Sequence, residues 1–89
     1  MLTREGEVLK VAGPMNIDSA AALLSQSEGM LSDVHVVDLS DVTEVDSAAV
    51  SLLLEWRRQA KTSTLRFANL PEALNSLAAL YGVTDLIPQ

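Results

Sequence analysis

The chain of 89 residues has no cysteine, which excludes disulfide bonds and thiolate metal ligands. Basic residues are also scarce: six Lys and Arg stand against twelve Asp and Glu, a formal charge of −6. Such an acidic chain lacks the positive surface that binds phosphate backbones or anionic lipid, so we expect no nucleic-acid partner and no direct membrane insertion. No apolar run approaches the ~20 residues of a membrane helix, and the first residues do not resemble a signal peptide. We therefore expect a cytoplasmic protein.

The residues that most enzymes need are missing as well. His35 is the only histidine, and the four glycines are isolated, so the chain has no glycine-rich phosphate loop. A triad could be drawn from Ser47, His35 and Asp38, but their spacing does not support one. The acidic stretch over residues 28–46 lacks the ligand spacing of a calcium loop. We expect no catalytic residues, no cofactor and no metal.

Hydrophobic residues make up 48% of the sequence, which is typical of a folded globule, and the length suits one domain over residues 1–89. Alternating apolar residues predict strands, whereas apolar residues three and four apart predict helices. The predicted strands are a hairpin over residues 2–12 that ends at Gly13-Pro14, then 34–39 and 64–68. A polar loop is predicted over residues 40–46. The predicted helices are a short one capped by Asn16 or Asp18, a long one over 47–61, and one from Pro71 to Gly82.

Strands that alternate with helices indicate a small α/β sandwich. Its sheet should be mainly parallel, with an antiparallel edge strand at the N-terminus and about three helices. The apolar residues at 86–88 should form a short tail against this sheet.

The long helix has a wider apolar face than packing on a sheet requires. Ala49, Leu53 and Trp56 fall in the sector expected to contact the sheet. Val50 and Leu54 extend the apolar arc to about 200°, whereas a helix on one sheet needs roughly 100°. Either other helices of the domain cover this surplus, or another protein does.

The side of this helix outside the core sector is a mixed stripe that suits a modest protein interface. We interpret it, with the neighbouring Asp46, as a candidate partner-binding surface consisting of Asp46, Ser47, Val50, Ser51, Leu54 and Arg58. Ser47 stands where the helix should begin. It is either an N-cap, the usual role of a serine at this position, or a phosphoacceptor.

The segment over residues 37–50 reads VDLSDVTEVDSAAV and resembles the signature of STAS domains, the fold of anti-sigma-factor antagonists. In that family an acid precedes the Ser or Thr that starts a helix, and Asp46 and Ser47 match this pair. The resemblance implies that Ser47 is a candidate kinase target. However, antagonists usually have glycine where this chain has Ala49, which weakens the kinase-substrate interpretation.

The C-terminal segment over residues 77–88 reads LAALYGVTDLIP and is similar to the end of the MlaB-like STAS domains. These are the small subunits of Mla-type phospholipid ABC transporters in Gram-negative bacteria. The resemblance implies a non-catalytic accessory subunit that binds the MlaF-like ATPase subunit at the inner membrane and supports outer-membrane lipid asymmetry. The alternative is an anti-sigma-factor antagonist regulated by phosphorylation of Ser47.

Overall fold

A computed structural model describes residues 1–60 and 65–89. Its elements follow the order β1 (Leu2–Glu5), β2 (Val8–Met15), α1 (Ala20–Ser27), β3 (Val36–Val45), α2 (Ser47–Gln59), β4 (Arg66–Ala68), α3 (Glu72–Leu80) and a 3₁₀ turn, η1 (Thr84–Leu86). The sheet order is β1-β2-β3-β4, with β1 antiparallel to β2 and the other pairs parallel. The predicted fold class is confirmed. The predicted helix end at Lys61 and the predicted strand start at Thr64 lie outside the described residues.

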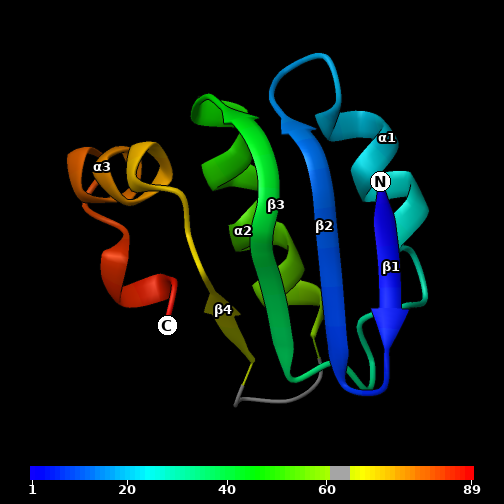
Figure 1. The fold of residues 1–89 in the computed structure, drawn as a ribbon. Coiled ribbons are helices and arrows are strands. Elements are labelled where there is room, and N and C mark those ends of the chain that lie inside the picture. Colours follow the sequence, from blue (N-terminus) through cyan, green and yellow to red (C-terminus); the bar gives the residue numbers. More distant parts are fainter. Residues whose placement is uncertain (61–64) are drawn as a thin grey trace.

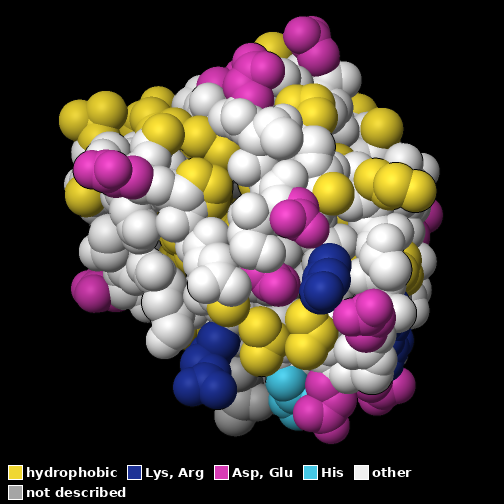
Figure 2. All heavy atoms as spheres, viewed as in Figure 1, with side chains coloured by type: hydrophobic (Ala, Val, Ile, Leu, Met, Phe, Trp, Pro, Cys, Tyr) yellow, Lys and Arg dark blue, Asp and Glu magenta, His cyan; other side chains and the backbone are white. Residues whose placement is uncertain are grey.

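The helices α1 and α2 lie behind one face of the sheet, and α3 lies beside β4 (Figure 1). Strand residues that point toward α1 and α2 are fully or almost fully buried, among them Leu9, Val37 and Phe67. The opposite face carries acidic, basic and apolar side chains side by side (Figure 2). The core therefore lies between the sheet and the helices, as expected for a two-layer sandwich.

The sequence predicted that the second strand ends at Gly13-Pro14. In the structure β2 continues to Met15. The pairing with β3 shifts register between Gly13 and Pro14, and Gly13 has a φ of +88°. Glycine adopts this backbone region without steric cost, so the strand passes the irregularity and buries Met15 completely.

The strand β3 also differs from its prediction. It starts at Val36 rather than at residue 34, and it continues to Val45 through the segment predicted as a polar loop. Its second half pairs with β2 from Ala12 to Met15. The polar side chains there are exposed, so the segment looks like a loop in sequence although its backbone belongs to the sheet.

The ends of α1 and α3 differ from the predicted caps by one or more positions. α1 has Ser19 as its N-cap rather than Asn16 or Asp18. The Oδ1 of Asn16 instead accepts hydrogen bonds from the backbone N–H groups of Asp18 and Ser19, at 3.0 and 3.1 Å, and so stabilises the turn before the helix. Pro71 is the N-cap of α3, one position before its predicted place. α3 ends at Leu80 with Tyr81 as its C-cap, so the predicted end at Gly82 is too late. Gly82, with a φ of +69°, follows the cap in the left-handed conformation that terminates many helices.

The core sector of α2 is packed as predicted. Ala49, Leu53 and Trp56 are buried, and the indole Nε1 of Trp56 donates a hydrogen bond to Ser27 Oγ at 2.8 Å. The C-terminal tail is also fixed: Ile87 is buried, and the carbonyl oxygen of Pro88 accepts a hydrogen bond from the backbone N–H of Phe67 in β4. No helix among the described residues is long and apolar enough to cross a membrane.

Candidate functional site

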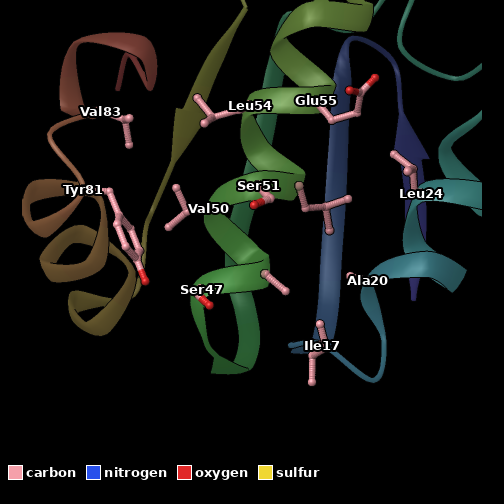
Figure 3. Close-up of a pocket in the computed structure, with 12 residues that line it drawn as sticks. Ile17, Ala20, Leu24, Ser47, Val50, Ser51, Leu54, Glu55, Tyr81 and Val83 are labelled. Carbon is pink, nitrogen blue, oxygen red and sulfur yellow. The ribbon is translucent and has the colours of Figure 1, made fainter.

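A groove with a volume of about 740 Å³ runs along the face of α2 that points away from the sheet (Figure 3). One of its walls comes from α1 and the loop before it. The opposite wall comes from the residues that follow α3. Its lining consists of Ile17, Ala20, Leu24, Ser47, Ala48, Val50, Ser51, Leu52, Leu54, Glu55, Tyr81 and Val83.

Small residues on α2 make the groove accessible. Ser47 and Ser51 lie one helical turn apart, both are exposed, and Ala48 lies beside them. Ile17 on one wall and Tyr81 on the other are large side chains that are 74% and 53% exposed, so both present apolar surface to the groove. The groove thus combines two exposed serines with a mostly apolar floor and apolar walls, a composition that suits a protein-binding site.

The two residues that gave α2 its surplus apolar face have different environments. Val50 is only 4% exposed and belongs to the core, so this part of the predicted surface is covered by the domain itself. Leu54 is half-buried at the edge of the core. Both side chains point toward Tyr81 and Val83 (Figure 3). The domain itself thus accounts for Val50, and covering by another protein stays a prediction for Leu54 alone.

The N-terminal end of the groove is held by Asp46, which is the N-cap of α2. Its Oδ1 accepts a hydrogen bond from the backbone N–H of Ala48 at 2.8 Å, and its Oδ2 accepts one from Ile17 at 3.0 Å. The interpretation of Ser47 as the N-cap is wrong by one position, because the side chain of Asp46 accepts the N–H of Ala48 instead. Ser47 is the first helical residue, and it is exposed in the groove.

The C-terminal end of the groove is held by a polar cluster. Arg58 Nε donates to Glu55 Oε1 at 3.1 Å, and a guanidinium nitrogen of Arg58 donates to Glu55 Oε2. Gln59 Nε2 donates to the same Oε2 at 3.0 Å. These hydrogen bonds from Arg58 and Gln59 lower the pKa of Glu55 below its usual value. The carboxylate is therefore charged and paired with Arg58.

The structure brings four of the predicted partner-binding residues into one groove: Ser47, Val50, Ser51 and Leu54. Asp46 and Arg58 flank its two ends and do not line it. Neither wall of the groove was predicted from the sequence. Tyr81 shares the periodicity of the buried Leu74 and Ala78. However, it follows the last residue of α3, and its side chain is exposed to solvent.

The residues considered for catalysis do not meet. His35 precedes β3 and Ser47 follows it, so the ten residues of the strand separate them and they lie at its opposite ends. The backbone N–H of His35 donates to Glu7, and its Nε2 lies 3.9 Å from a carboxylate oxygen of that residue. Within residues 1–60 and 65–89, no three Asp, Glu or His side chains gather as a metal site would require.

The fold places this chain in a known class of small α/β domains. It is similar to the structure described as the anti-sigma factor antagonist SpoIIAA in its unphosphorylated form, with a TM-score of 0.70 and 14% sequence identity. The similarity covers 98% of this chain and 84% of that one. At this identity the likeness shows the fold alone.

The sequence defines the family more narrowly. A family model described as "Mlab, STAS domain" matches residues 1–88. The chain therefore belongs to the MlaB-type STAS domain family. A comparison with curated proteins found no match.

Proposed function

We propose that this chain is a non-catalytic accessory subunit of an Mla-type phospholipid ABC transporter. In this proposal it binds the MlaF-like ATPase subunit on the cytoplasmic side of the inner membrane. It supports assembly and activity of a complex that maintains outer-membrane lipid asymmetry in a Gram-negative bacterium. Membership of the MlaB-type family over residues 1–88 supports this choice among the roles of STAS domains.

The observation that carries the proposal is the apolar groove on α2. Ile17 and Tyr81 expose large side chains on opposite walls, and Leu54 is only half-buried between them. Covering apolar surface releases about 25 cal/mol per Å², so a partner that fills the groove would gain affinity from all three side chains. The groove therefore offers the apolar centre that a stable interface needs.

The chemistry of the groove supports binding rather than catalysis. Its ionisable side chains are Glu55, which is paired with Arg58, and Tyr81. Ser47 and Ser51 are the hydroxyl groups on its floor, and the single histidine is at the other end of β3. An activated serine needs a general base within hydrogen-bond reach, and the groove lining provides no histidine or lysine for that role.

A binding assay with single substitutions tests the proposal. The purified chain should bind the MlaF-like ATPase of the same genome, and Leu54→Asp should weaken this binding at least about tenfold, because it places a charge in the apolar centre. Leu80→Asp is the matched control: Leu80 is 76% exposed and does not line the groove, so its substitution should leave affinity unchanged. Circular dichroism checks that both variants fold. Equal binding by Leu54→Asp and the native chain would contradict the groove as the binding site.

A second function has one specific observation in its favour. Ser47 is exposed in the first turn of α2, on a fold similar to that of an anti-sigma factor antagonist. In this alternative a kinase phosphorylates Ser47, and the added negative charge next to Asp46 and the groove changes partner binding.

Intact-mass measurement of the protein from its native cells distinguishes the two functions. Regulation at Ser47 predicts a species heavier by one phosphate that disappears in Ser47→Ala and persists in Ser51→Ala. Ser51 is the matched control because it is an exposed serine one turn further along the same helix. Absence of the heavier species under every growth condition would contradict the alternative.

A further inference from the structure

We infer that the groove accepts one helix of the ATPase partner in a fixed direction, antiparallel to α2. The inference rests on the proposed function and specifies how the partner is recognised. It follows from three features of the groove: its apolar walls, the small residues on its floor, and the opposite charges at its two ends.

The shape of the groove favours a helix as the occupant. Its walls are apolar and offer few hydrogen-bonding groups, so an extended segment would leave backbone N–H and C=O groups unpaired. A helix satisfies its own backbone and presents only side chains. Ser47, Ala48 and Ser51 are small, which lets a row of partner side chains pack closely against α2 between the walls.

The end of the groove near Ser47 is acidic. Asp18 is exposed and adjoins the wall residue Ile17, and Glu44 is exposed at the end of β3. Asp46, the N-cap of α2, accepts a hydrogen bond from the backbone N–H of Ile17. No lysine or arginine occurs between residues 11 and 56, so these three carboxylates have no basic neighbour from that part of the chain.

The other end of the groove is basic. Arg57 and Arg58 are exposed in the last turn of α2. Arg58 offsets the charge of Glu55, which leaves the positive charge of Arg57 in excess there. A partner helix that matches these charges has basic residues near Asp18 and acidic residues near Arg57.

Charge placement along ordinary helices then sets the direction. Acidic residues are favoured in the first turn of a helix and basic residues in the last, because of the helix dipole. A partner helix of this kind places its C-terminal turn near Ser47 and its N-terminal turn near Arg58. It therefore runs antiparallel to α2, an orientation that also aligns the two helix dipoles favourably.

Charge reversal at either end tests the complementarity. Asp18→Lys and Arg58→Glu should each weaken ATPase binding roughly fivefold at low salt, mainly through slower association, and added salt should reduce the difference. Arg66→Glu is the control, because Arg66 is exposed on β4 and outside the groove. Asp18→Lys raises the net charge by two, whereas Arg58→Glu and Arg66→Glu each lower it by two. Equal effects of the two arginine reversals, with an opposite effect of Asp18→Lys, would mean that only net charge matters, which would overturn the inference.

Cross-linking tests the direction. The chain has no cysteine, so Glu44→Cys and Arg57→Cys each create a unique site for a photoactivatable maleimide. In the complex with the ATPase, the label at residue 44 should react with the C-terminal turn of one partner helix and the label at residue 57 with its N-terminal turn. Reversed ends, or labels on two unrelated segments, would overturn the direction while leaving ATPase binding intact. If the native chain fails to bind the ATPase, both the proposed function and this inference fail.

Discussion

At the scale of single residues, Asp46 connects two elements of the candidate site. One of its carboxylate oxygens caps α2 through Ala48, and the other holds the backbone of Ile17. The residue thus joins the floor of the groove to one wall. Its position before a helix is readable from the sequence, but the bond to Ile17 depends on the tertiary fold and could not be predicted.

Asp46→Ala should lower the free energy of unfolding by about 1–2 kcal/mol, because it removes the helix cap. Asp46→Ser keeps a cap for α2 but is too short to keep the second bond to Ile17. We expect this variant to recover most of the stability and still weaken ATPase binding. Urea denaturation and a binding assay measure the two effects. Full recovery of both by Asp46→Ser would show that the bond to Ile17 does not shape the groove.

Asp38 in β3 is a second carboxylate whose environment matters. Its Oδ1 accepts hydrogen bonds from the side chain of Asn69 and the backbone of Ser40, both at 3.0 Å. These two bonds, with a smaller contribution from Lys10, lower the pKa of Asp38 below 3.8 in the folded chain. Asn69 itself has a φ of +58°, a backbone region that asparagine tolerates better than most residues.

A carboxyl group whose pKa is lower in the folded than in the unfolded state stabilises the fold at pH values above the unfolded pKa. This stabilisation is lost as the pH falls through the folded pKa. We therefore expect Asp38→Asn to be about 1 kcal/mol less stable than the native chain at pH 7. The difference should shrink as the pH falls below 3.8, the ordinary pKa of Asp, and through the lower pKa of folded Asp38, where the native chain becomes protonated too. Denaturation at several pH values measures this. The exposed Asp33, changed to Asn, is the control and should show a smaller difference at pH 7.

At the scale of elements, the sequence predicted the order of strands and helices and the core face of α2. Hydrophobic periodicity is enough to predict the core face of a helix. Ala49, Leu53 and Trp56 fall on one face of α2 because of their spacing alone, independent of what packs against that face. The second half of β3 could not be predicted in the same way, since its exposed side chains look like those of a loop. The covering of Val50 and the exposure of Tyr81 depend on where α3 packs, which no local pattern contains.

The contact between α1 and α2 provides a prediction at this scale. Ser27 Oγ accepts the indole N–H of Trp56 and donates to the carbonyl of Leu24, and both Ser27 and Trp56 are fully buried. Ser27→Ala leaves the indole N–H without its partner, so we expect a loss of about 1–3 kcal/mol. Ser25→Ala is the control, because Ser25 is exposed on the same helix. Urea denaturation followed by the fluorescence of the single tryptophan measures both. Equal midpoints for the two variants would contradict a stabilising role for the bond.

At the scale of the whole molecule, a chain of this length has a thin core, so single buried side chains carry a large share of its stability. The C-terminal tail, residues 86–88, is an example of such a contribution. It crosses back to β4, where the carbonyl oxygen of Pro88 accepts the N–H of Phe67, and it buries Ile87. Neighbouring Leu86 is 42% exposed. Two adjacent aliphatic residues of similar size therefore have very different environments.

We expect Ile87→Ala to lower the free energy of unfolding by about 2–4 kcal/mol, because it leaves a cavity beside the sheet. Leu86→Ala should cost much less, since its side chain is partly in water already. In a domain of this size the first change should lower the Tm by at least about 8 °C, which thermal melts resolve easily. ATPase binding measured below both transitions should be unchanged, because neither residue lines the groove. A loss of binding by folded Ile87→Ala would show that the tail belongs to the interface, and that the groove on α2 is only part of the surface that the partner contacts.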